Sequence, residues 1–110
     1  MAWQKSMSLA ENIYKATEQL PSSEKFALGD QMRRCAISIP SNIAEGKGRS
    51  SDRDYKRFLH IAKGSSQELE TQILLCKRLY PQVANYTLLL KNITDVQRIL
   101  SGLITSLKPS

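Results

Sequence analysis

The residues with the clearest chemical potential lie between Glu45 and Arg57. The stretch "EGKGRS" at 45–50 places two glycines around a lysine, as loops that hold phosphate often do. A nucleotide-binding P-loop requires GxxxxGK[ST] between a strand and a helix, so that successive backbone N–H groups surround the phosphates. Here the glycine spacing differs and no strand pattern precedes the segment. The stretch therefore does not predict nucleotide hydrolysis.

The same region concentrates positive charge. Residues 46–57 carry five basic and two acidic side chains, a local charge of +3 and half of the chain's net +6. At a helix start, free N–H groups and the helix dipole also favour anions. Phosphate contact there predicts salt-sensitive, weakly sequence-selective nucleic-acid binding, because bound polyanions release counterions. A solvated helix start paired with Asp52 and Asp54 is the equally weighted alternative. The predicted contacts are Lys47, Arg49, Arg53, Lys56 and Arg57, extended by Arg33 and Arg34 one helix earlier.

Catalysis and metal binding have little support in the sequence. His60 is the only histidine, and Glu68 and Glu70 are two residues apart, so they point to different faces of a helix. Cys35 and Cys76 have no CxxC spacing and fall among apolar positions, which favours buried reduced thiols over a disulfide or a metal site. We expect no catalytic residue, no metal and no cofactor.

Four amphipathic segments must position these residues. Apolar residues recur at steps of three and four, which predicts helices at about 2–20, 22–46, 51–80 and 83–107. Ser51 with Asp54 fits a capping box at the start of the third helix, and Pro81 closes it. Short links and the absence of strand-like alternation predict an all-α fold, an up-down-up-down antiparallel four-helix bundle that forms a single domain over residues 1–110.

Some apolar residues exceed what a single buried stripe requires. Leu9 and Ile13 lie beside Met7 and Tyr14 on the first helix, and Ile37 adds an apolar position on the second. Surplus apolar surface of this kind is typical of interaction sites. We expect these residues to contribute to contact between subunits.

Six further residues have structural interpretations. Pro40 lies inside a helix, where proline removes a backbone donor, and predicts a kink. Asn42 and Glu45 are three apart and are interpreted as a buried polar clamp to a facing helix, with a ligand contact as the minor alternative. Gly46 and Gly48 are together interpreted as a helix stop, and Gly64 as a place where another helix packs closely.

The bulk composition points to a cytoplasmic protein with a polyanionic partner. The chain is 41% hydrophobic and 24% charged, without an apolar run long enough to span a bilayer or the unbroken apolar segment of a secretory signal. Its calculated pI is about 9.6. The basic balance favours RNA or DNA as a partner and gives no indication of membrane association.

Two stretches carry a family resemblance. "GDQMRRCAISIPSNIAEGKGR" at 29–49 and "DYKRFLHIAKGSSQELETQILL" at 54–75 closely resemble the four-helix-bundle proteins encoded by intervening sequences in bacterial 23S rRNA genes. The accessory variability protein of diversity-generating retroelements is related to that family. Trp3 in the first helix and "GLITSLK" in the last extend the resemblance over nearly the whole chain, while Lys47 stands where an aromatic residue is frequent.

The resemblance implies a non-enzymatic protein that assembles into a ring-shaped homopentamer and binds nucleic acid. In the retroelement branch it implies RNA and a reverse transcriptase as partners. We therefore expect an oligomer that binds RNA through a positive surface. The alternative is a scaffold or accessory subunit for a partner enzyme, without direct nucleic-acid binding. An enzyme is the least favoured of the three functions.

Overall fold

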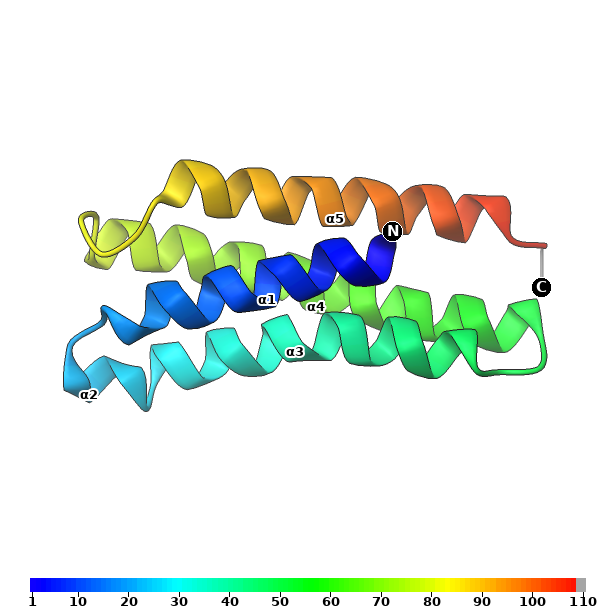
Figure 1. Cartoon of the computed structure of the whole chain (residues 1–110), viewed down its shortest axis with the longest axis horizontal. Helices are drawn as coiled ribbons and strands as arrows, with labels where there is room; N and C mark the ends of the chain where they lie inside the picture. Colours follow the sequence, from blue (N-terminus) through cyan, green and yellow to red (C-terminus); the bar gives the residue numbers. More distant parts are fainter. Residues whose placement is uncertain (109–110) are drawn as a thin grey trace.

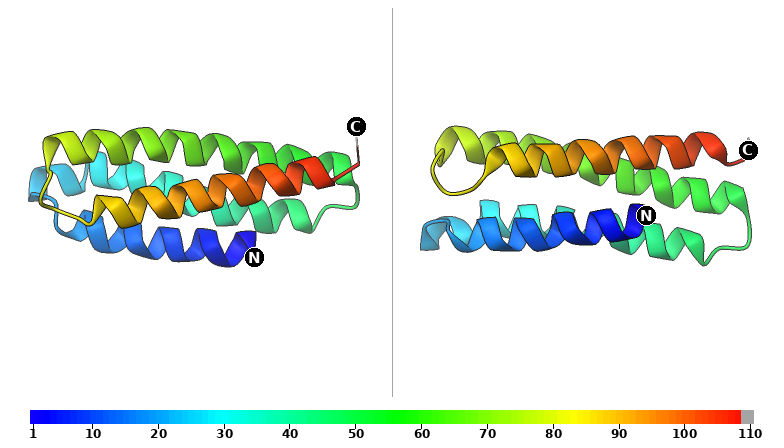
Figure 2. Two further views of the ribbon diagram at one scale, coloured as in Figure 1. Left: turned by 90° about the horizontal axis from the view of Figure 1, so that it is seen from above. Right: turned by 45° about the horizontal axis from the view of Figure 1, so that its top comes forward.

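Four long helices lie side by side in the computed structural model, which describes residues 1–108 (Figure 1). They are α1 (Ala2–Glu18), α3 (Leu28–Lys47), α4 (Asp52–Leu79) and α5 (Tyr86–Ser106), and a single turn, α2 (Ser22–Lys25), lies between the first two. Successive long helices run in opposite directions, and α5 packs on both α4 and α1 (Figure 2). The predicted all-α, up-down-up-down four-helix bundle is confirmed.

The core forms where the apolar stripes of the four helices meet. Leu9 and Ile13 of α1, Ile39 of α3, Leu69 of α4 and Ile93 of α5 have no solvent exposure. Burying a side chain of this size contributes about 1.5–3 kcal/mol to stability. The same stripes hold the thiols of Cys35 and Cys76 inside the bundle, both buried and unpaired, as the sequence predicts.

The predicted second helix at 22–46 is interrupted, which the periodicity does not reveal. Ala27 has φ −116° and ψ −93°, outside the helical region, so α2 ends before α3 begins. Arg33 of α3 donates a hydrogen bond from Nη2 to the carbonyl of Lys25 at 2.6 Å. Tyr80, just beyond α4, donates to Glu24 at 2.7 Å. These contacts satisfy polar groups at the break and hold α2 against the bundle.

The helix starts agree with local capping chemistry. Ser51 accepts a hydrogen bond from the backbone N–H of Asp54 at 3.2 Å, which confirms the predicted cap of α4. At α5 the side chain of Asn85 accepts from Leu88 N at 3.0 Å, so this helix begins at Tyr86 rather than near residue 83. Each cap satisfies a backbone donor that the helix itself leaves free.

Gly46 and Gly64 do not play the roles predicted for them. Of the two glycines predicted to end the second helix, Gly48 is the C-cap of α3, whereas Gly46 lies inside the helix, in its last turn. A Cβ added at Gly46 would lie 2.7 Å from Phe58 Cβ, so α3 and α4 pack closely at this position. Gly64 is exposed, and an added Cβ would meet nothing within 4 Å. The interpretation of Gly64 as a close-packing site is wrong.

The predicted polar clamp is also corrected. Asn42 donates to the carbonyl of Ser38 at 2.8 Å within α3, and the Ser38 hydroxyl joins that of Ser65 on α4 at 2.8 Å. Glu45 is exposed and forms an ion pair at 2.6 Å with Arg49, four residues later in the chain. The contact between helices therefore comes from two serines, because Glu45 points to solvent. Pro40 is buried, and α3 stays helical on both sides of it.

Candidate nucleic-acid interface

The turn between α3 and α4 brings the five predicted contact residues to one end of the bundle. Lys47 is the last residue of α3 and Arg49 lies in the turn, while the other three occupy the first two turns of α4. Figures 1 and 2 show that this end projects past the start of α1. We call this set, defined by Lys47, Arg49, Arg53, Lys56 and Arg57, the basic end.

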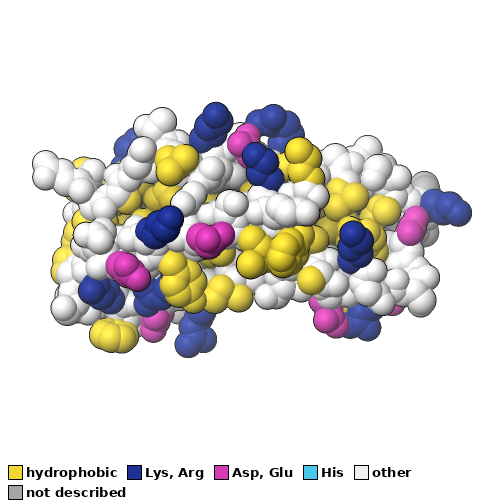
Figure 3. Space-filling view, viewed as in Figure 1, with side chains coloured by type: hydrophobic (Ala, Val, Ile, Leu, Met, Phe, Trp, Pro, Cys, Tyr) yellow, Lys and Arg dark blue, Asp and Glu magenta, His cyan; other side chains and the backbone are white. Residues whose placement is uncertain are grey.

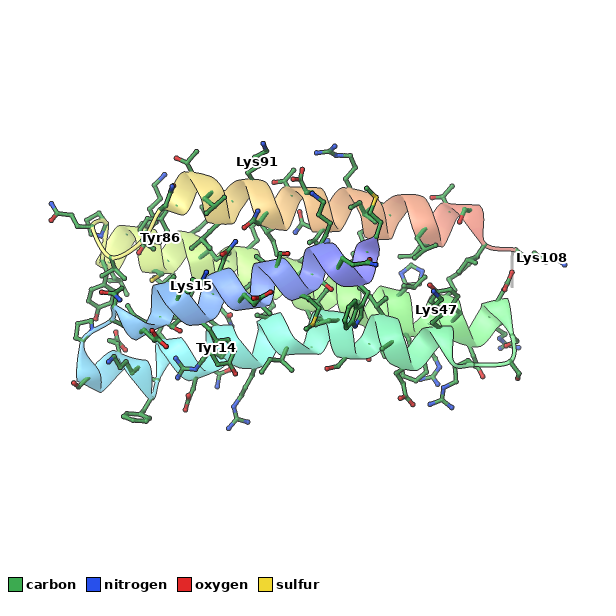
Figure 4. All side chains as sticks on the ribbon, in the orientation of Figure 1. Tyr14, Lys15, Lys47, Tyr86, Lys91 and Lys108 are labelled. Atoms are coloured by element: carbon green, nitrogen blue, oxygen red, sulfur yellow. The ribbon has the colours of Figure 1, made fainter. Side chains whose placement is uncertain are left out.

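Additional charge reaches the basic end from elsewhere in the chain. Lys108, at the end of α5, lies at the same end of the molecule as Lys47 (Figure 4). The backbone N–H of Lys108 donates to Asp52 at 3.4 Å. His60 lines a shallow depression with Arg53, Asp54, Lys56 and Arg57. Sequence spacing could not place Lys108 here, because it is 56 residues from Asp52 and arrives through the topology.

Pairing with acidic residues neutralises only part of this charge. Arg49 pairs with Glu45 at 2.6 Å, and Arg57 Nε lies 4.0 Å from Asp54 Oδ1. Both pairs are exposed, and such pairs typically contribute 0–1 kcal/mol. Within residues 1–108, no ion pair involves the other three members of the basic end. The three basic residues without an ion pair in this part of the chain are consistent with phosphate contact, and the two exposed ion pairs are consistent with a solvated helix start.

Two arginines of the basic end share an aromatic neighbour. The guanidinium carbon of Arg49 lies 4.7 Å from the ring centre of Phe58, and that of Arg57 lies 4.5 Å from it. Cation–π contacts favour distances under about 6 Å. Phe58 is half-buried between α3 and α4. The charge pattern of the sequence does not indicate this arrangement.

Arg33 and Arg34 lie elsewhere on the molecule. Arg33 is mostly covered: it donates to Thr17 Oγ1 at 3.0 Å and pairs with Asp30. Arg34 is exposed. Arg33 is 16 residues before Arg49, and at 1.5 Å per helical residue this separation is about 24 Å. We leave these two arginines out of the basic end.

A separate apolar groove runs between α1 and α3. Trp3, Met7 and Tyr14 line it from α1, and Ile37 and Pro40 line it from α3. The exposed fractions of Trp3, Met7, Tyr14 and Ile37 are 38–44%. In Figure 3 apolar side chains gather over this face, with charged residues beside them. Figure 4 shows Tyr14 and Lys15 on the same part of α1.

The groove changes the assignment of the surplus apolar residues. Leu9 and Ile13 are fully buried inside the protomer, so the expectation that they form a subunit contact is wrong for these two. Met7, Tyr14 and Ile37 remain available on the surface. The period of α1 alone does not separate the two stripes, because adjacent apolar tracks look equivalent until the neighbouring helices are placed.

Burial changes the pKa values of the titratable residues in the core. Burial raises the pKa of the Cys35 thiol, with a further contribution from the nearby Glu68 carboxylate. Burial likewise raises the pKa of the Cys76 thiol. Tyr86 donates to the carbonyl of Tyr80 at 2.7 Å, and burial raises its pKa as well. Raised pKa values keep these groups protonated and weak as nucleophiles.

Comparison with known proteins identifies the family. Residues 1–102 match the 23S rRNA-intervening sequence protein family. The chain belongs to this family. A crystal structure of a protein of unknown function from the S23 ribosomal protein family of Bacteroides thetaiotaomicron superimposes with a TM-score of 0.87 and 24% identity, covering 96% of this chain and all of that one. That similarity shows a shared fold. No curated protein matches the chain.

The sequence indicated the basic residues of this family member and, through Met7, Tyr14 and Ile37, part of the groove lining. It did not indicate the shared aromatic contact of Arg49 and Arg57. The one local signal for that contact was Phe58 directly after Arg57. No sequence pattern connects Phe58 to Arg49.

Proposed function

We propose that this member of the 23S rRNA-intervening sequence protein family is a non-enzymatic, ring-shaped homo-oligomer that binds RNA through the basic end of each subunit. The observation that carries the proposal is the gathering of five basic side chains at one end of the bundle. A surface of this kind suits a phosphate backbone, because Lys and Arg neutralise phosphates without reading bases.

The apolar groove supports assembly with further copies of the chain. Other exposed apolar side chains lie on α4, where Leu74, Leu75 and Leu79 near the end of the helix are 44–52% exposed. The groove and this cluster are different surfaces. Contact between two different surfaces of identical subunits is head-to-tail, and it closes into a ring when the rotation between subunits permits. A ring repeats the basic end around one axis and multiplies its phosphate contacts.

A scaffold for a partner enzyme is the second candidate function. The observation that favours it is again the groove, whose exposed Trp3 and Tyr14 are residue types enriched at protein interfaces. A reverse transcriptase is the kind of partner that the retroelement relatives imply. In that function the basic end serves solubility or partner docking and does not bind RNA directly.

RNA binding measured against salt separates the two functions. A labelled single-stranded RNA of mixed sequence is titrated with the protein at several salt concentrations. We expect affinity to fall steeply as salt rises, because each phosphate contact releases counterions. Charge reversal of Arg49, Arg53 and Arg57 to glutamate should weaken binding at least tenfold and leave the oligomer mass unchanged.

The matched control reverses three exposed basic residues at other places. Lys5, Lys91 and Arg98 are exposed and lie outside the basic end, the groove lining and the exposed apolar residues of α4. Their reversal changes the net charge by the same amount and should weaken binding much less. Equal losses in the two triple variants would refute the basic end as the site. Absence of RNA binding at low salt would refute the RNA function and leave the scaffold function.

A further inference from the structure

Phe58 holds a fixed position between the two arginines of the basic end that contact it. A Cβ added at Gly46 would meet Phe58 Cβ at 2.7 Å, so α3 and α4 are in close contact at the base of this side chain. The ring continues outward and has the guanidinium carbons of Arg49 and Arg57 at 4.7 and 4.5 Å from its centre. The anchored ring therefore limits where both guanidinium groups can lie.

The two cationic groups are close together. Because both distances are measured to one ring centre, the two guanidinium carbons are at most about 9 Å apart. Arg49 approaches from the turn and Arg57 from the second turn of α4. Without the ring, two long arginine side chains would spread through solvent, because like charges repel and each side chain has many rotamers.

An aromatic ring is a suitable platform for this chemistry. A guanidinium group is flat, and when its face lies on a ring its N–H edge stays free for a phosphate. Arginine binds phosphate oxygens through paired N–H donors, and these charge-assisted hydrogen bonds are among the strongest in proteins. Phe58 has no polar atom and does not compete for the N–H groups.

The resting partners of the arginines are weak. Arg49 donates to Glu45 at 2.6 Å, and Arg57 Nε lies 4.0 Å from Asp54, with all four side chains at least 40% exposed. Water and salt screen such pairs. An RNA phosphate can replace these carboxylates, because its binding releases counterions from the RNA. Glu45 therefore competes with phosphate for Arg49.

We propose that Arg49 and Arg57, positioned by Phe58, form a phosphate clamp that binds the phosphodiester backbone of RNA. The inference rests on the proposed RNA function and deepens it by naming the two guanidinium groups that bind phosphate and the residue that positions them. The clamp binds the backbone of one strand and reads no base edge. Phe58 is a positioning residue, because it acts through the arginines.

The test compares Phe58→Leu with Phe58→Trp, neither of which alters net charge. Single-stranded RNA binding is measured at one fixed salt concentration, and thermal melts verify folding. Phe58→Leu should weaken binding about five- to tenfold, because both arginine side chains must then be ordered when RNA binds. Phe58→Trp should keep affinity near that of the unsubstituted protein. Equal affinity for Phe58→Leu and the unsubstituted protein would overturn the clamp.

A second variant tests the clamp without touching the core. Glu45→Gln removes the carboxylate that competes for Arg49 and should tighten RNA binding about threefold, in line with a weak exposed ion pair. The matched control is Asp95→Asn, which adds the same charge and removes a carboxylate paired with Arg98, outside the basic end. A Glu45→Gln gain no larger than that of Asp95→Asn contradicts the clamp.

NMR of the arginine side chains separates failure of the clamp from failure of the RNA function. The Nε–H resonances of Arg49 and Arg57 should shift on addition of RNA, and those of Arg78 should not. Binding of RNA without these shifts overturns the clamp and leaves the RNA function standing. If RNA does not bind, the RNA function fails, and tripolyphosphate tests the two arginines alone: shifts of the same two resonances show that they bind phosphate, and their absence overturns the clamp.

Discussion

Gly46 and Gly64 provide a matched pair in which the same substitution has opposite expected effects on stability. Both glycines lie inside long helices, and neither has a positive φ. Replacing a helical glycine with alanine stabilises by about 1 kcal/mol, because alanine loses less backbone entropy on folding. At Gly64 an added Cβ meets open space, so Gly64→Ala should gain the whole amount.

At Gly46 the added methyl group enters the contact between α3 and α4. It would lie 2.7 Å from Phe58 Cβ, 2.9 Å from Tyr55 Cδ1 and 3.2 Å from the Tyr55 carbonyl oxygen. The first and third of these atoms are close to or part of the backbone, so the helices must separate. Overpacking of this kind costs about 1–3 kcal/mol. An overpacking cost at the upper end of that range, about 3 kcal/mol, less the gain of about 1 kcal/mol in helix propensity, leaves Gly46→Ala destabilised by about 2 kcal/mol.

Thermal unfolding followed by circular dichroism measures both effects. At roughly 4 °C per kcal/mol for a chain of this size, Tm should fall by about 8 °C for Gly46→Ala and rise by about 4 °C for Gly64→Ala. Gly102→Ala is a second control in open space. All variants are compared at one protein concentration, because oligomers have concentration-dependent Tm values. A Gly46→Ala protein as stable as Gly64→Ala would refute the close packing of α3 on α4.

Three further predictions address the cap of α4, the core tyrosine and the groove. Ser51→Ala removes the hydrogen bond to Asp54 N and should lower the free energy of unfolding by about 1 kcal/mol in urea denaturation, whereas Ser50→Ala should be neutral. Burial raises the pKa of Tyr86 above its ordinary value near 10. Its contribution to the free energy of unfolding is therefore complete below pH 10 and is lost at higher pH, because the unfolded chain ionises first. Stability should therefore fall above pH 10, and Tyr86→Phe should flatten that fall while costing about 1 kcal/mol at neutral pH; an unchanged alkaline slope would contradict the assignment. Ile37→Glu places a charge in the groove and should lower the oligomer mass in light scattering, whereas an unaltered mass would remove Ile37 from the subunit contact.

The four long helices follow from the sequence because each keeps an apolar period over several turns, and the Ser51 cap is equally local. The break at Ala27 cannot be predicted from the sequence in this way, because it depends on a hydrogen bond from Arg33 of the next helix to the Lys25 carbonyl. Gly64 misled because a helical glycine signals close packing only when a neighbour is present, and none is within 4 Å.

The candidate site was predictable in part for a similar reason. The basic residues lie close together in the sequence, within residues 47–57, so the single turn between two helices brings them to one end of the bundle. Their positions next to Phe58, Lys108 and the groove depend on how the helices pack against one another. The apolar periodicity of a single helix does not determine that packing. Glu45 was assigned to the wrong side of α3, because a spacing of three from Asn42 places two residues near one face without deciding whether that face is buried.

The most direct test of the proposed function is the mass of the protein in solution, with and without single-stranded RNA, at low and high salt. Light scattering coupled to size exclusion measures this mass. We predict one defined multiple of the 12.4 kDa subunit that gains the mass of RNA at low salt and releases it at high salt without falling apart. A monomer that elutes apart from RNA at every salt concentration would contradict both the ring and its RNA-binding role.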